Sequence, residues 1–278
     1  IRRPPRSTLS SSSAASDVYK RQKYRFSDGA AVVFGGSGGL GTGIVDLLSK
    51  CGTDVAFTYL NNEEAAKENI AKIESNGQKG FSSSVDLLDL DKVENFVESS
   101  KKEFGRIHSV IFATGPFLHI MPILDADPED VYKTLDTDIK GFYHVLRACV
   151  PVLRDGGGGS ITALTTAAIH KYISTDGLSS VPKSGVQHLC TAISREEGHN
   201  GIRANCVAVG LIAVGLSQEI DSPPGGILDQ WMQQVPLGRA GDPNELIDQV
   251  KKSTGHFHIY TFGGLKETNK WLVKNNYA

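Results

Sequence analysis

The chain shows no charge bias, and two classes of partner are therefore not expected. Its 278 residues include 29 lysines and arginines against 31 aspartates and glutamates, which leaves a formal net charge of −2. This balance provides no basic surface that would attract nucleic acid or an anionic membrane. The sequence also lacks an apolar run of the roughly 20 residues that a membrane-spanning helix needs. We expect neither a nucleic acid nor a membrane as a partner.

Cysteine and methionine are scarce as well. The four cysteines, Cys51, Cys149, Cys190 and Cys206, have neither the spacing of a disulfide framework nor that of a metal site. Their scatter favours a reducing compartment, so we expect a cytoplasmic protein that holds no metal.

The composition is otherwise that of an ordinary globular protein. Hydrophobic residues make up 40% and charged residues 22% of the chain, so a sizeable core can form. The length is compatible with one or two domains, and a single α/β domain is the simpler expectation. The 30 glycines indicate several tight backbone turns.

Residues 1–22 do not continue this pattern. The segment is rich in serine, arginine and proline and has no apolar periodicity. An organelle transit peptide has this composition, whereas a twin-arginine signal is rejected because no apolar stretch follows Arg2 and Arg3. The segment also resembles translated adapter sequence, and we interpret it as a disordered leader that is a non-native scar of sequence assembly. The fold is therefore expected to begin at residue 23.

From residue 23 onward, short β-branched runs alternate with longer helical stretches. The predicted strands are Ala30–Phe34, Asp54–Tyr59, Phe81–Val85, Ser109–Ala113, Ser160–Leu164 and Arg203–Val207. Two predicted helices end near Lys50 and near Phe104. Three others span Glu63–Asn76, Pro128–Leu153 and Lys183–Glu197. This alternation predicts right-handed βαβ units and hence a single α/β domain with a doubly wound, Rossmann-type parallel sheet.

A glycine-rich segment lies between the first predicted strand and the first predicted helix. It reads Gly35-Gly36-Ser37-Gly38-Gly39-Leu40-Gly41. Glycines at this point let the backbone approach a pyrophosphate, and the helix that follows directs its amides and positive dipole at the phosphates. The position of the turn, more than its glycine content, indicates a dinucleotide site.

The chain resembles the short-chain dehydrogenase/reductase family from about Lys23 to Val250. The spacing Gly35-x3-Gly39-x-Gly41 is similar to the family's glycine motif, and further family motifs follow in the same order. They are Asp86-Leu87, Phe112-Ala113-Thr114-Gly115, Ser160 to Thr166, Asn205 to Gly210 and Pro236-Leu237-Gly238-Arg239. The resemblance implies hydride transfer between a nicotinamide cofactor and a small carbonyl or alcohol substrate, in a homodimer or homotetramer.

The same resemblance implies a set of site residues. Lys183 matches the catalytic lysine, Thr166 takes the place of the catalytic serine with Thr165 as the alternative, and Asp138 takes the place of an asparagine. The residues expected to bind the cofactor are Gly35, Ser37, Gly39, Leu40, Gly41, Tyr59, Asp86, Leu87, Ala113, Gly115 and Lys183.

One position departs from the family pattern. The residue four before Lys183 is Ser179, where the family has a tyrosine that acts as acid or base. An aliphatic hydroxyl has a pKa far above the roughly 10 of a phenol, so Ser179 is expected to bind a substrate rather than protonate it. Tyr172 and His170 lie nearby in the sequence, either as substitutes for the missing group or as ordinary surface residues.

The end of the second predicted strand bears on the choice of cofactor. An acidic residue there would bind a free ribose 2′-hydroxyl and repel a 2′-phosphate. The sequence reads Thr58-Tyr59-Leu60-Asn61-Asn62, which contains neither an acid nor an arginine. We expect NADP, with NAD as the alternative.

Two functions remain open at this point. One is an NAD(P)-dependent oxidoreductase with an atypical acid, and the other is a non-catalytic NADP-binding protein that has lost its proton donor.

Residues 251–278 do not follow the family pattern and are expected to form an atypical C-terminal segment.

Overall fold

The computed structural model describes residues 26–116, 120–212, 226–233, 235 and 239–242. The proposed leader, the atypical C-terminal segment and most of the Pro236–Arg239 motif lie outside the described residues. Among the described helices, none is both long and apolar enough to cross a bilayer.

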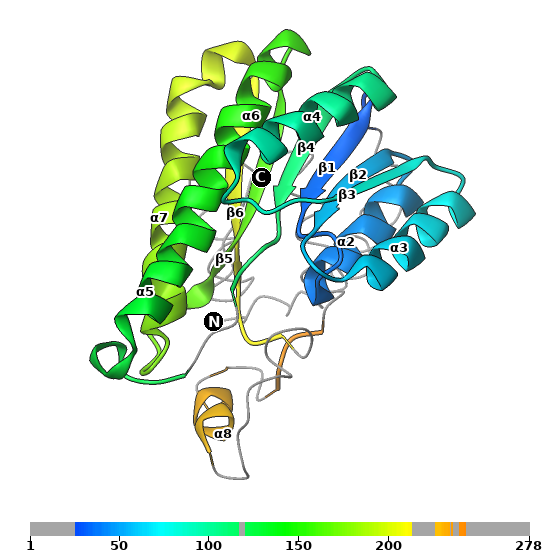
Figure 1. Ribbon diagram of the computed structural model, residues 1–278. Helices are drawn as coiled ribbons and strands as arrows, with labels where there is room; N and C mark the ends of the chain where they lie inside the picture. The colour runs from blue at the N-terminus through cyan, green and yellow to red at the C-terminus, as the bar shows by residue number, and fades with distance from the viewer. Residues whose placement is uncertain (1–25, 117–119, 213–225, 234, 236–238, 243–278) are drawn as a thin grey trace, which may run out of the picture.

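A six-stranded sheet forms the centre of the molecule (Figure 1). Its order is β3-β2-β1-β4-β5-β6, and every neighbouring pair of strands is parallel. The strands are β1 (Ala30–Phe34), β2 (Asp54–Tyr59), β3 (Gly80–Ser84), β4 (Ile107–Phe112), β5 (Gly159–Thr166) and β6 (Ile202–Val209). The doubly wound parallel sheet expected from the sequence is confirmed.

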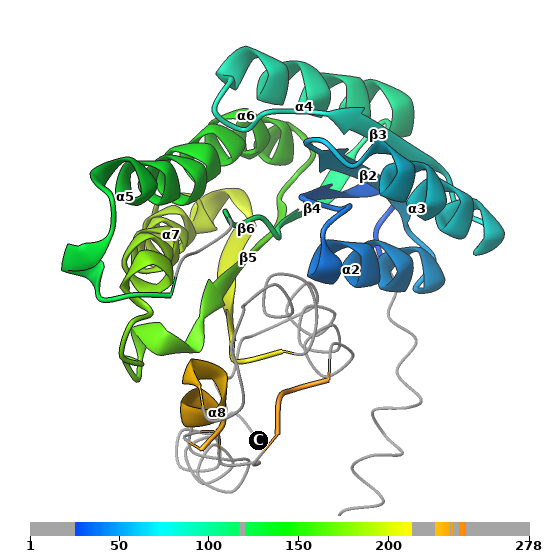
Figure 2. The ribbon, with the colours of Figure 1, turned by 60° about the horizontal axis from the view of Figure 1, so that its bottom comes forward.

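Helices cover both faces of this sheet (Figure 2). One face carries α4 (Leu90–Phe104), α6 (Gly141–Asp155) and α7 (Gly177–Glu196), and the other carries α2 (Gly39–Lys50) and α3 (Glu63–Ser75). The remaining helical elements are α5 (Pro128–Leu135), α8 (Ile227–Met232) and the short turns η1 (Ile123–Asp125), η2 (Asp136–Lys140), η3 (Ala167–Ile169) and η4 (Gly198–Asn200).

The central strands are apolar on both sides because helices cover both sides. All five residues of β1 are fully buried. Val32 and Phe34 pack in the core beneath α4 and α6, whereas Ala31 and Val33 pack against α2 and α3. Side chains alternate between the faces of a strand, so one short apolar run supplies both layers.

Two helical predictions need correction, and both corrections shape the site. The stretch predicted as one helix from Pro128 is α5, then the π-helical turn η2, then α6; the wider turn places Asp138 in the interior. The helix predicted to begin at Lys183 begins at Gly177, because burial of Leu178 and Pro182 outweighs the missing amide of the proline. Ser179 therefore lies on a helix and not in a loop.

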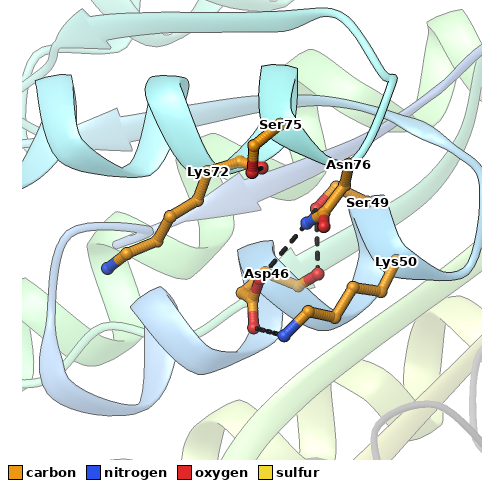
Figure 3. A network of polar contacts seen from close by, with 6 residues as sticks. All are labelled: Asp46, Ser49, Lys50, Lys72, Ser75 and Asn76. Atoms are coloured by element: carbon orange, nitrogen blue, oxygen red, sulfur yellow. Dashed lines mark hydrogen bonds and ion pairs between the residues drawn. The ribbon is translucent and has the colours of Figure 1, made fainter.

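A polar network joins the C-terminal ends of α2 and α3 (Figure 3). The Asn76 amide donates to Ser49 Oγ at 2.8 Å and to Asp46 Oδ1 at 3.2 Å. Asp46 also forms an ion pair with Lys50 at 2.6 Å. These contacts hold α3 beside α2, which matters because α3 supports the turn that begins α2.

A buried histidine lies at the same edge of the sheet, where the strands begin. His108 Nε2 is 2.9 Å from Thr53 Oγ1, and its Nδ1 is 2.9 Å from Ser109 Oγ. The ring of Phe26 stacks on the imidazole at a centroid distance of 5.2 Å. Burial lowers the pKa of His108 to about 4, with the charge of Arg106 acting in the same direction.

The low pKa of His108 predicts a specific loss of stability in acid. In the unfolded chain His108 takes up a proton near its ordinary pKa of about 6.5, whereas in the folded chain it stays neutral down to about pH 4. The stability that neutral His108 contributes is therefore complete above pH 6.5 and is lost as the pH falls toward 4. The loss is at most about 3.4 kcal/mol, because the pKa falls from 6.5 to about 4 and each pKa unit corresponds to about 1.36 kcal/mol. Urea unfolding at several pH values should show a shallower acid dependence in His108→Gln than in wild type. The exposed control His188→Gln should keep the wild-type slope, and equal slopes in all three proteins would contradict the prediction.

Candidate functional site

A glycine-rich turn connects β1 to α2 at the edge where the strands end. Gly35 has a φ of +88°, and a Cβ there would lie 2.7 Å from Thr114 Cγ2. A Cβ on Gly41 would overlap the carbonyl oxygen of Gly35. Both positions therefore exclude a side chain, and the turn folds closely against the start of α2.

The N-terminus of α2 lacks the groups that usually complete a helix end. Gly38 is the N-cap and offers no side-chain acceptor, and the first turn contains no acidic residue. In contrast, the side chains of Asn62, Asp89 and Asp127 accept first-turn amides at α3, α4 and α5. The amides of residues 39–41 and the positive end of the helix dipole remain for an anion.

Two residues that the sequence analysis did not identify support this turn. Thr58, near the end of β2, accepts the Gly35 amide on Oγ1 at 3.0 Å and the Gly36 amide on its carbonyl at 2.9 Å. The Asn69 side chain donates to the Gly36 carbonyl at 2.9 Å and to Thr42 Oγ1 at 3.1 Å. Asn69 lies on the apolar stripe of α3, and a polar residue within such a stripe is the signal that would have identified it.

The residues predicted to contact the adenosine half lie at the end of β2 and just after β3, at the same edge. Tyr59 is half-buried, and Asp86 is exposed with its Oδ1 accepting the Leu88 amide at 2.9 Å. Leu87 is buried, and its carbonyl accepts a hydrogen bond from His144 Nδ1 at 2.8 Å. Strands β2 and β3 run parallel to β1, so the turns that follow them share one edge with the glycine turn.

Lys183 is the centre of the second half of the site. Its Nζ donates to the carbonyl oxygen of Thr114 at 2.7 Å and lies 2.8 Å from Asp138 Oδ1. The ammonium also lies 5.4 Å from the centroid of the Phe112 ring. Residues 113–115 follow β4, and a Cβ on Gly115 would lie 3.8 Å from Nζ. The lysine thus bridges α7, η2 and the end of β4.

The ion pair between Asp138 and Lys183 is shielded from solvent. The exposed fractions of the two side chains are 2% and 12%. Burial raises the pKa of Asp138, and the neighbouring ammonium opposes that rise. Because the carboxylate is this close, much of the lysine's charge is neutralised within the protein.

The structure distinguishes between the two threonines predicted at the end of β5. Thr165 is buried, and its hydroxyl donates to the Val207 carbonyl at 3.4 Å. Thr166 is half-buried and accepts the Ala168 amide at 3.2 Å, an interaction that does not use its own proton. Thr166 is therefore the better placed donor toward a ligand.

Ser179 and Lys183 lie one helical turn apart on α7, which packs against β5 and η3. Ser179 is half-buried, whereas Tyr172 is 60% exposed and His170 is exposed as well. The structure therefore leaves Tyr172 and His170 at the surface of the loop before α7. Within the described ranges, no group of three or more His, Cys, Asp or Glu side chains is arranged to hold a metal.

Comparison with known proteins agrees with this geometry. A family model described as enoyl-(acyl carrier protein) reductase matches residues 35–250. A 3-oxoacyl-acyl-carrier-protein reductase of Chlamydia muridarum is 28% identical over 78% of this chain and 86% of its own length. An NADP-dependent mannitol dehydrogenase of Hypocrea jecorina is 29% identical over 77% of this chain and 81% of its own.

The fold is shared with solved structures too. A short-chain type dehydrogenase/reductase from Mycobacterium ulcerans superimposes with a TM-score of 0.77 at 26% identity. The match covers 84% of this chain and 85% of the other. With the glycine turn, the sheet order and the matched family model in agreement, the chain belongs to the short-chain dehydrogenase/reductase family.

Proposed function

We propose that the protein is an NAD(P)-dependent oxidoreductase that transfers a hydride between a nicotinamide cofactor and a small carbonyl or alcohol substrate. The observation that carries this proposal is the position of Lys183. Its ammonium is held at the carbonyl of Thr114, directly after β4. The glycine turn follows the neighbouring strand β1, and the strand order reverses between these two strands. A dinucleotide binds at this point in doubly wound sheets.

The described residues fit such a cofactor. Glycines 35 and 41 leave the backbone free of side chains, and the uncapped start of α2 offers amides to the pyrophosphate. The bound nicotinamide would supply or accept the hydride. The chain's own groups would position the cofactor. Lys183 would contact the nicotinamide ribose, and Tyr59 would lie near the adenosine ribose. The other proposed cofactor contacts are Ser37, Gly39, Leu40, Asp86, Leu87, Ala113 and Gly115.

The catalytic residues that we propose are Thr166, Ser179, Lys183 and Asp138. Thr166 would donate its hydroxyl proton in a hydrogen bond to the substrate oxygen. Ser179 would orient the substrate, because its hydroxyl is too weak an acid to protonate it near neutral pH. Asp138 would fix the ammonium of Lys183 at 2.8 Å while reducing its effect on neighbouring hydroxyls.

A second function is favoured by Ser179 and by Asp138. A serine where the family pattern has tyrosine, together with a lysine neutralised by Asp138, suits a protein that binds NADP without turning over a substrate. The lysine's contact with a ribose would serve binding alone. Turnover of a carbonyl substrate distinguishes this alternative from an oxidoreductase.

We further propose a cytoplasmic homodimer or homotetramer. Three of the four free cysteines are buried, and the fourth is half-buried, as suits a reducing compartment. Tyr132 on α5, Tyr143 on α6 and Val181 on α7 are 58%, 50% and 49% exposed. These apolar side chains on neighbouring helices support an interface with another copy of the chain.

The first prediction concerns the glycine turn. Gly39→Val should abolish NADPH binding, because the added side chain occupies the space that the pyrophosphate needs, while the melting temperature stays nearly unchanged. Titration followed by NADPH fluorescence measures the binding. Gly198→Ala is the matched control, since a Cβ there meets nothing within 4 Å. Equal affinity in Gly39→Val and wild type would show that the cofactor lies elsewhere.

The second prediction concerns the 2′-phosphate. NADPH should bind more tightly than NADH, because no carboxylate follows β2 until Glu63. Asn61→Asp should weaken NADPH binding about tenfold, equivalent to about 1.4 kcal/mol, and should strengthen NADH binding. Asn61→Gln adds no charge and should keep the wild-type preference. A preference that Asn61→Asp does not alter would place the ribose away from this turn.

The third prediction separates the enzyme from the binding protein. Wild type should reduce 2,3-butanedione with NADPH, and Thr166→Val should lower kcat/KM by about 10- to 100-fold without changing NADPH affinity, through loss of one hydrogen bond to the reacting oxygen. Thr166→Ser keeps the hydroxyl and should retain most of the activity. NADPH binding without any turnover in wild type would favour the non-catalytic alternative.

A further inference from the structure

We propose that Asp176 supplies the proton that carbonyl reduction requires. This inference rests on the proposed oxidoreductase function and identifies a group that neither the family pattern nor the sequence analysis assigned. The need for it follows from Ser179, whose hydroxyl is too weak an acid, and from Asp138, which neutralises the lysine beside it.

Asp176 lies on the face of α7 that carries the site. It is the N-cap of this helix, and the positions of Asp176, Ser179 and Lys183 follow an i, i+3, i+7 spacing that lies along one side of a helix. Lys183 is the one of the three whose direction is known, because its Nζ contacts Thr114 and Asp138. The aspartate therefore lies two turns before the lysine, on the same side of α7.

The backbone of Asp176 is held firmly while its carboxyl group is left free of the helix. Its carbonyl accepts the amide of Ser180 at 2.9 Å, the hydroxyl of Ser180 at 2.9 Å and the amide of Ser179 at 3.2 Å. An aspartate at an N-cap usually accepts a first-turn amide with its side chain, as Asp89 and Asp127 do. The carboxyl of Asp176 makes no such cap.

The environment of this carboxyl suits an acid that works near neutral pH. Asp176 is half-buried, and burial raises its pKa to about 7. The titratable side chains on the surrounding elements are Asp125 on η1, Glu129, Asp130, Tyr132 and Lys133 on α5, Asp136, Asp138 and Lys140 on η2, and His170, Lys171 and Tyr172 on the preceding loop; on α7 itself Lys183 is the nearest in sequence.

The proposed step is balanced in atoms and electrons. In reduction, the carbonyl carbon accepts a hydride, with its two electrons, from the reduced nicotinamide, and the π bond of the carbonyl breaks. The carbonyl oxygen takes the proton of the protonated Asp176 carboxyl, which becomes a carboxylate. The products are an alcohol, the oxidised cofactor and ionised Asp176, which solvent then reprotonates. Oxidation of an alcohol reverses each step, with Asp176 as the base.

The activity test compares Asp176→Asn with Asp125→Asn, an exposed carboxylate on η1. With NADPH and 2,3-butanedione, Asp176→Asn should lower kcat/KM by about 10²–10⁴-fold, the usual contribution of a positioned general acid. NADPH affinity should not change, and Asp125→Asn should behave as wild type. The wild-type rate of reduction should fall as the pH rises through about 7. Adding Ser179→Tyr to Asp176→Asn should restore turnover by supplying a phenol beside Lys183.

A second readout does not depend on turnover. The pKa of the Asp176 carboxyl is about 7 in the folded chain, above the ordinary 3.8. The stability that the protonated carboxyl contributes is therefore complete below pH 3.8 and is lost as the pH rises through about 7. Asp176→Asn should therefore gain stability relative to wild type between pH 4 and pH 8. The gain is at most about 10³-fold in the folding equilibrium constant, because each pKa unit corresponds to a factor of ten. Asp176→Ser, a smaller neutral variant, should show the same trend if Asp176→Asn folds poorly.

Each result leads to a decision. Full turnover in Asp176→Asn would overturn the role of Asp176 and leave the oxidoreductase function standing. Loss of turnover in Tyr172→Phe, with turnover kept in Asp176→Asn, would do the same. A stability difference that does not vary with pH would also overturn the inference, because the carboxyl would then titrate normally. NADPH binding with no turnover in wild type would overturn the inference and the proposed function together. Loss of turnover in Asp176→Asn, with unchanged NADPH affinity and a pH-dependent gain in stability, supports the proposal.

Discussion

A single ammonium group joins three separate parts of this molecule. Lys183 extends from α7 to the backbone carbonyl after β4 and to a carboxylate on the π-helical turn before α6. Each contact requires the others, because a buried ammonium is stable only where acceptors and an opposite charge surround it. The position of α7 against the sheet, the wide turn at residues 136–140 and the turn after β4 are therefore mutually dependent. The candidate site is the place where they meet.

The other half of the site depends on close approach and not on charge. Backbone passes so near backbone at Gly35 and Gly41 that no Cβ fits, and Thr58 and Asn69 hold the turn from the neighbouring strand and helix. The same turn leaves the amides at the start of α2 without partners in the helix. A rigid, uncapped helix end opposite a fixed ammonium is a surface suited to an anionic dinucleotide, which supports the function that we propose.

Much of this arrangement could be predicted from the sequence. Strands with both faces covered are continuous apolar runs, so β1 and β2 were predicted with the bounds that the structure has. The glycine spacing, and the series of motifs after it, identified the family because each motif must follow a particular strand of a parallel sheet. Helix boundaries near proline were less accurate: the helix predicted from Lys183 begins at Gly177, and burial of the residues around Pro182 sustains it.

The sequence by itself determined the class of fold, the place of the dinucleotide turn and the absence of a tyrosine four residues before Lys183, because these depend on local periodicity and on residue identity. The tertiary structure decided what the remaining polar groups can do. It joined Asp138 to Lys183 across 45 residues of sequence, separated Thr166 from the buried Thr165, placed Asn69 beneath the glycine turn and left the carboxyl of Asp176 uncapped in a poorly solvated position. Such properties depend on which groups meet and how much water surrounds them, and both follow only from the packing of elements that are distant in the chain.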